Sequence, residues 1–330
     1  MSQIESSQEK ENLLGPIWDI LLTSVLPFLF VFIAIISQAE LSSKIILTLY
    51  TLFSFPHFMA SYDIAFSRKH YRNDHKFILY GFPLVSLAII FGTFYLYGSI
   101  EPIIQILIVM LIWHFVKQSY GVSIWSSVRH NVSLTKNQKT FLLLNFLLIG
   151  MLAIFYVHDS DNSMNYAGQY ITLANVPELF TDNIFAIVIV ILVAVYISIL
   201  IYNRTKPWEV ALVFFPMVSN LTWFYAIKIN PVAIALLPFL HGMQYTPFIL
   251  KASKKLPRTK LKVFLMTLIY IATGYVILHE LPRALSIWAE GELGGLLFSA
   301  VILTVNFHHY AIDSVIWKIR KKEVREQMGL

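Results

Sequence analysis

The sequence predicts an all-α protein, a polytopic bundle of about ten helices that span a membrane. Of its 330 residues, 57% are hydrophobic and 13% are charged, whereas soluble domains usually carry about 25% charged residues. Apolar stretches of about 20 residues, long enough to cross the hydrocarbon core of a bilayer, recur along the whole chain. This composition excludes a soluble globular enzyme, a disordered chain and a nucleic-acid-binding protein of the ordinary type.

Ten apolar segments are predicted to span the membrane, and the connections between them are short. They cover 16–38, 44–66, 77–97, 101–125, 139–158, 183–203, 207–228, 230–251, 261–280 and 293–319. We expect one transmembrane domain over 16–319, between a cytoplasmic tail at 1–15 and a basic cytoplasmic tail at 320–330. The first segment follows a polar tail and lacks a clear small-residue cleavage site, so it is predicted to be a span and not a cleaved signal peptide.

Charged residues alternate between the connections. Those after the even-numbered spans are basic, and they contain Arg68, Lys69, Arg72, Lys76, Arg129, Lys136, Lys139, Arg204, Lys206, Lys254, Lys255, Arg258, Lys260 and Lys262. The connections after the odd-numbered spans are mainly acidic. Because Lys and Arg are enriched in cytoplasmic loops, the basic connections and both termini are predicted to face the cytoplasm. The expected location is a bacterial inner membrane.

Four spans carry histidine in their interior: His57, His114, His241 and the adjacent pair His308 and His309. Ionisable groups inside a membrane are costly, so each is a candidate for a functional site. In the predicted topology all four spans run in the same direction. Each histidine lies about ten residues from the cytoplasmic end of its span, so at 1.5 Å per residue the four depths agree within roughly 3 Å.

Histidines at one depth on four helices predict a metal site. The chain has no Cys, which excludes thiolate ligands and iron–sulfur clusters. Imidazole is the commonest transition-metal ligand. We therefore expect His57, His114, His241 and one of His308 and His309 to bind a single metal, with His308 favoured because His309 aligns with Asp313. Iron (Fe²⁺) is the favoured metal, and zinc, copper and haem are the alternatives.

Polar residues lie about one helical turn beyond these histidines. They are Ser61 beside His57, Gln118 beside His114, Gln244 and Tyr245 beside His241, and Asp313 beside His309. A metal-bound histidine usually donates its second ring N–H to such a neighbour. Asp313 is predicted to orient His309, with Gln118, Gln244 and Tyr245 supporting the site. For the two glutamines, hydrogen bonding between helices is the alternative role.

The predicted site lies at bilayer depth, so its substrate is expected to be lipid-soluble. The spans around it are rich in aromatic residues, which suit a long, flat polyene or acyl chain, although ordinary helix packing gives the same composition. Iron(II) held by neutral imidazoles with an open position can bind O₂. The sequence thus favours an O₂-dependent oxidoreductase, either a dioxygenase or a monooxygenase, with O₂, membrane lipids and a lipid-soluble substrate as partners and no nucleic acid.

Three short motifs stand out in these spans, namely Pro56-His57 with Asp63 downstream, Trp113-His114 and His308-His309. They resemble motifs of the Brp/Blh family of integral-membrane β-carotene dioxygenases. The family typically has Pro-His-Gly and a closer Asp, and its late histidines lie about one helical turn apart. The resemblance implies non-haem iron held by histidine and cleavage of a carotenoid by O₂.

Three other classes remain open. One is a haem protein with axial histidines from two helices. Another is a transporter of metal or small molecules, which would use helices broken near the middle of the membrane. The third is a lipid hydroxylase or desaturase of the di-iron kind, although the chain contains no HxxxH box.

Overall fold

The computed structural model describes most of the chain. The described residues are 16–37, 43–158, 164–166, 169–171, 176–204, 206–254, 260–318 and 321–327. The predicted tail at 1–15 lies outside them, and a short helix occupies part of the predicted tail at 320–330.

Nearly all described residues are helical. In chain order the helices are α1 (Pro16–Ile20), η1 (Leu21–Val25), α2 (Leu26–Ser37), α3 (Ser43–Leu49), η2 (Tyr50–Ser54), α4 (Phe55–Ser67), α5 (Lys69–Asp74), η3 (Phe77–Gly81), α6 (Phe82–Tyr97), α7 (Glu101–Arg129), α8 (Lys136–His158), α9 (Glu178–Asn203), α10 (Pro207–Ile229), η4 (Pro231–Leu236), α11 (Leu237–Lys254), α12 (Lys260–Tyr275), η5 (Val276–Glu280), α13 (Leu281–Ala289), α14 (Gly291–Ile316) and α15 (Lys322–Gln327). A small antiparallel hairpin, β1 (Met164–Tyr166) and β2 (Gln169–Ile171), lies between α8 and α9. The all-α prediction is confirmed, and this hairpin is the one departure from it in the described part of the chain.

Nine of the ten predicted spans are confirmed as helices long and apolar enough to cross a membrane. They are Lys44–Ser67, Phe77–Tyr97, Glu101–Arg129, Lys136–His158, Glu178–Asn203, Pro207–Ile229, Ala233–Lys251, Leu261–Ala289 and Gly291–Ile316. The first predicted span, 16–38, contains a shorter apolar helix over Ile17–Ile33. By length and composition, these helices indicate an integral membrane protein. Which face meets the cytoplasm stays a prediction.

A π-helical turn precedes a proline in four places. The turns η1, η2, η3 and η5 end directly before Leu26-Pro27, Phe55-Pro56, Phe82-Pro83 and Leu281-Pro282. Proline cannot donate a backbone hydrogen bond, and its ring clashes with the carbonyl one turn earlier, so a wider turn relieves the clash. Because His57 follows Pro56 directly, the turn η2 helps to set the direction in which this histidine points.

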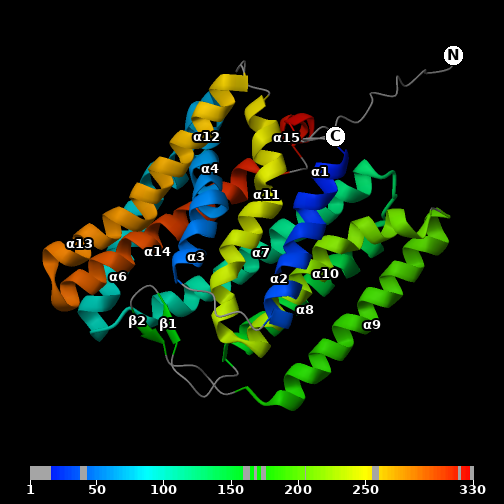
Figure 1. Cartoon of the computed structure of the whole chain (residues 1–330), viewed down its shortest axis with the longest axis horizontal. Helices are drawn as coiled ribbons and strands as arrows, with labels where there is room; N and C mark the ends of the chain where they lie inside the picture. Colours follow the sequence, from blue (N-terminus) through cyan, green and yellow to red (C-terminus); the bar gives the residue numbers. More distant parts are fainter. Residues whose placement is uncertain are drawn as a thin grey trace.

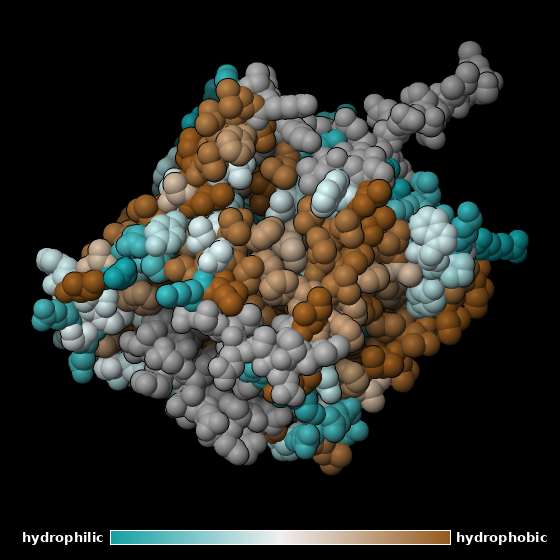
Figure 2. All heavy atoms as spheres, viewed as in Figure 1, coloured by the Kyte–Doolittle hydropathy of each residue, from teal (hydrophilic) through white to brown (hydrophobic). Residues whose placement is uncertain are grey.

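The most buried spans cross the middle of the bundle, and the least buried ones flank it (Figure 1). Large parts of α7, α10, α11 and α14 are buried, whereas α9 and the continuous helix α12–η5–α13 lie at opposite edges. Exposed side chains of the edge helices, such as Val190 and Leu265, are apolar. Figure 2 shows apolar residues over most of this face and hydrophilic residues toward its margins. Such a surface suits contact with lipid.

Candidate metal centre

Four helices bring one histidine each to a common point inside the bundle. His57 lies at the start of α4, His114 in the middle of α7, His241 near the start of α11 and His309 in the second half of α14. α4 contacts both α11 and α14, and α14 also contacts α7. The prediction that histidines from four spans gather in one place is therefore confirmed.

A glycine beside His241 allows α11 to approach the residues before His57. A Cβ atom at Gly242 would lie 2.6 Å from the carbonyl oxygen of Phe53 in η2. A side chain does not fit in this gap unless one helix moves, so the contact requires glycine. The close approach leaves the imidazole rings of His57 and His241 with centroids 5.0 Å apart.

The imidazoles meet through their Nε2 atoms. The Nε2 atoms of His114 and His241 are 3.1 Å apart, and those of His57 and His309 are 3.2 Å apart. Each of the four histidines offers a ring nitrogen within 4.8 Å of the others. Three are buried, and the side chain of His114 is 12% exposed. We call these four residues the His cluster.

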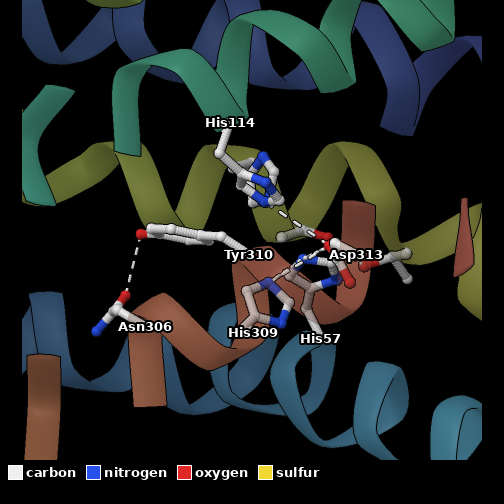
Figure 3. A network of polar contacts seen from close by, with 9 residues as sticks. His57, His114, Asn306, His309, Tyr310 and Asp313 are labelled. Atoms are coloured by element: carbon white, nitrogen blue, oxygen red, sulfur yellow. Dashed lines mark hydrogen bonds and ion pairs between the residues drawn. The ribbon is translucent and has the colours of Figure 1, made fainter. Parts of the chain in front are cut away.

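Asp313, one turn beyond His309 on α14, directs its carboxylate into the His cluster (Figure 3). Its Oδ2 atom lies 3.4 Å from Nε2 of His309 and 3.6 Å from Nε2 of both His57 and His114. The side chain is 5% exposed, and within the described residues neither oxygen accepts a hydrogen bond of normal geometry, although the Ser61 and Trp317 side chains adjoin the carboxylate. The cluster therefore has one carboxylate among its imidazoles, aimed at the same point.

The position of Asp313 differs from the one that its predicted role requires. An acceptor that orients a metal-bound histidine must face the ring nitrogen that does not bind the metal. Here Oδ2 faces Nε2 of His309, whereas Nδ1 of His309 is buried without a hydrogen-bond partner in the described part of the chain. The i,i+4 spacing correctly places both side chains on one helix face, but the carboxylate lies where a ligand would lie.

The preference for His308 over His309 is also wrong. Adjacent helical residues point about 100° apart, and the packing of α14 turns His309 inward. His308 instead receives a hydrogen bond from the Tyr62 hydroxyl at Nδ1, 3.0 Å away, and donates from Nε2 to the carbonyl oxygen of Ile78, 2.9 Å away. The carbonyl can only accept, so it fixes this tautomer. His308 is thus engaged with α4 and η3 and not with the cluster.

The two predicted glutamines do not bond the cluster. Gln244 accepts a hydrogen bond from the Ser119 hydroxyl and donates one to the Thr23 carbonyl, both at 2.9 Å. It therefore ties α11 to α7 and η1, which is the helix-packing alternative. The Gln118 amide is buried without a hydrogen-bond partner among the described residues. Tyr245 does reach the site, since its ring lies 5.3 Å from that of His57 and runs nearly parallel to that of His241.

Aromatic rings cover the cluster. The closest contacts are Phe58 on His309, Phe115 on His241 and Tyr310 on His114, with ring centroids 4.0, 4.4 and 4.5 Å apart. The Tyr310 hydroxyl donates to Asn306 at 3.1 Å, which holds that ring in place (Figure 3). Trp317, whose position near a span end is typical of an interfacial indole, adjoins the Asp313 carboxylate, as does Ser61. The spacing predicts Ser61 beside His57, but its contact with Asp313 depends on how α4 packs against α14. For Trp317, the sequence indicates only the interfacial position.

The shortest spacings between the donor atoms are those expected around one metal ion. Two atoms that each lie about 2.1 Å from an ion are about 3.0 Å apart at a right angle and about 3.4 Å apart at the tetrahedral angle. The Nε2 pairs at 3.1 and 3.2 Å and the Nε2–Oδ2 distances of 3.4 to 3.6 Å fall on these values or close to them. The His cluster is thus a group that could hold a metal ion.

Comparisons with protein-family models, with curated proteins and with solved structures find no match. The fold and the His cluster define a membrane protein compatible with metal binding. The resemblance to the Brp/Blh family rests on the sequence motifs alone.

Proposed function

We propose that this protein is a membrane oxygenase that uses non-haem iron and acts on a lipid-soluble substrate, with carotenoid cleavage as the first candidate. One iron ion is held by His57, His114, His241, His309 and Asp313. The expected location is a bacterial inner membrane, and O₂ is the second substrate.

The unbalanced charge of Asp313 carries the metal proposal. A buried carboxylate without hydrogen bonds or a cation costs several kcal/mol. Within the described residues the imidazoles of His57, His114 and His309 lie nearest to it, and they balance its charge only when protonated. The Ser61 and Trp317 side chains adjoin the carboxylate, but neither makes a hydrogen bond of normal geometry to it. A divalent cation between the imidazoles and the carboxylate removes this cost, because all five groups supply a lone pair to it.

The number and type of donors favour iron. Zinc in proteins is almost always bound by four ligands in structural sites and by three plus water in catalytic ones. Four imidazoles and one carboxylate supply five donors and leave one position of an octahedron open. Nitrogen and oxygen donors with an open position are typical of non-haem iron oxygenases. Bound iron would supply the redox chemistry that O₂ activation requires.

The same geometry argues against the alternatives. A porphyrin occupies the plane between two axial ligands, and no plane of that size fits among four imidazoles whose Nε2 atoms approach to 3.1 and 3.2 Å. A di-iron desaturase needs a second group of ligands, and the described residues contain one His cluster. A transporter is expected to place polar groups along a path, whereas these ionisable groups meet at one point.

The apolar surroundings favour a hydrocarbon substrate. Phe58, Phe115 and Tyr310 pack on the imidazoles, so the walls exclude water and suit a flat polyene. Cleavage by a dioxygenase breaks one C=C bond and the O–O bond and forms two C=O bonds. The four electrons that O₂ gains come from the substrate, so this reaction needs no other reductant. A monooxygenase would need two further electrons from a separate donor.

Expression in a carotene-producing bacterium tests the proposal. Carotene is expected to bleach and a shorter aldehyde to accumulate, only in the presence of O₂ and only with an intact His cluster. If carotene stays unchanged, carotene is excluded as the substrate, but the proposal of an oxygenase stands. Iron-loaded protein that neither consumes O₂ nor changes its spectrum with O₂ would contradict the oxygenase itself.

A further inference from the structure

The short helix α5 is fixed to the end of α14, where three membrane spans end. It lies between the span Lys44–Ser67 and the span Phe77–Tyr97, and the span Gly291–Ile316 ends beside it. The Tyr71 hydroxyl on α5 donates to the carbonyl oxygen of Ile316 at 3.2 Å, and the Tyr71 side chain is buried. Two segments 245 residues apart in the sequence are thus held together at the boundary of the membrane.

Two lysines and a histidine come together at this junction. The Nζ atom of Lys321 lies 5.7 Å from the centre of the Tyr71 ring. Burial lowers the pKa of His75, and the charges of Lys321 and Lys318 lower it further, so both lysines lie near this imidazole. Among the charged groups that act on His75, only Asp74 raises its pKa. We call His75, Lys318 and Lys321 the basic cluster, and all three are half-buried.

The positive charge of the basic cluster is not balanced by ion pairs. Within the described residues neither Lys318 nor Lys321 forms one. Lys228, at another span end, is instead held by the carboxylates of Glu178 and Asp182 at 3.3 and 3.1 Å. Like charges that are partly buried are only partly screened by salt. An anion placed between the two lysines would therefore be favoured.

The surroundings of the basic cluster resemble a binding site for a lipid headgroup. Three exposed basic residues of the same segment, Lys69, Arg72 and Lys76, add to its positive charge. The span that follows them exposes large apolar side chains, which include Phe77 and Leu84. Basic residues directly outside membrane spans attract anionic lipids, and basic pockets between helices bind their headgroups.

We propose that the basic cluster binds the phosphate headgroup of an anionic membrane lipid, with the acyl chains along the exposed apolar side chains of the span that begins at Phe77. The phosphate oxygens can accept charge-assisted hydrogen bonds from both lysines. A lipid fits better than a free phosphate ion, because the apolar surface next to the cluster also needs a partner. This site is separate from the metal centre and does not depend on it.

Native mass spectrometry of the delipidated protein in detergent tests the proposal. Phosphatidylglycerol is expected to bind at least about tenfold more tightly than phosphatidylcholine, which has a phosphate but no net charge. Glycerol phosphate, which has the anion without acyl chains, should compete only at much higher concentrations than the lipid.

The double variant Lys318→Gln and Lys321→Gln should lower the affinity for phosphatidylglycerol by about tenfold or more. The matched control is Lys136→Gln with Lys139→Gln, which removes two exposed charges from another basic connection and should leave the affinity nearly unchanged. If the double variant unfolds, Lys321→Gln alone should still weaken binding.

Two results would overturn the proposal. Equal binding of the two lipids, or an equal loss of affinity in the control variant, would show that binding follows net charge and not the basic cluster. Competition by glycerol phosphate at the concentration of the lipid would show a site for free phosphate.

Discussion

His309 and Asp313 lie one turn apart on α14 and present Nε2 and Oδ2 to the same point, 3.4 Å from each other. Side chains in a helix lean toward its N-terminus, so the carboxylate of Asp313 reaches back over His309. This arrangement places the one buried acid of the site among the atoms that face the proposed ion. It makes Asp313 a proposed ligand and the only charged one.

Asp313→Asn is expected to lower the metal affinity by at least about tenfold, because it removes the one anionic donor. In protein loaded with Co²⁺, loss of a ligand should also strengthen visible absorption, which rises as the coordination number falls from five to four. His308→Ala, a change outside the cluster, should leave both properties unaltered. A spectrum that stays the same in Asp313→Asn would show that the carboxylate is not a ligand.

Gly242→Ala is expected to separate α11 from η2 and so to disturb the site. The added Cβ would lie 2.6 Å from the Phe53 carbonyl oxygen, and relief of such overpacking typically costs about 1–3 kcal/mol. Both the metal content and the thermal unfolding temperature should fall.

Gly92→Ala is the matched control, because a Cβ at Gly92 meets nothing within 4 Å in the described structure. Alanine also favours a helix by up to about 1 kcal/mol over glycine, so this variant should be as stable as the parent or slightly more. Full metal content in Gly242→Ala would contradict the role assigned to this contact.

Gln244→Leu tests whether Gln244 stabilises the packing of helices or supports metal binding. It leaves the Ser119 hydroxyl and the Thr23 carbonyl without this partner, and each buried group left unpaired costs about 1–3 kcal/mol. The unfolding temperature should fall while about one metal per chain remains. Loss of metal at unchanged stability would restore the predicted role of Gln244 beside His241.

Much of the fold could be predicted because an apolar segment of about 20 residues identifies a helix that spans the membrane. Nine predicted segments match helices of the structure closely, and the shared depth of His57, His114 and His241 followed from counting residues to the span ends. The positions of the spans and the depths of the histidines depend on the length and composition of each apolar segment, and both can be read from a single sequence.

What could not be predicted depends on how each helix rotates about its axis. The choice between His308 and His309 is a rotation of about 100°, and it is decided by contacts with Tyr62 and Ile78 that lie far away in the sequence. The hydrogen bonds of Gln244 depend in the same way on which helices become neighbours. Residue spacing within one span carries no information on these contacts.

The predicted topology remains to be tested. Reporter fusions after Met328 and near Ala167 should report a cytoplasmic C-terminus and an external connection between α8 and α9, because basic connections stay inside. A control fusion in the basic connection near Arg258 should match the C-terminal one. An external C-terminus would reverse the direction of every span and contradict the assignment.

The metal content of two adjacent variants tests the central claim most directly. Purified, iron-supplied wild-type protein and His308→Ala should each contain about one iron per chain, whereas His309→Ala should contain much less, since it removes one of five donors. Both substitutions remove the same side chain from neighbouring positions of α14, so a general effect on folding would appear in both. Full iron content in His309→Ala, or equal loss in the two variants, would contradict a metal centre built on the His cluster.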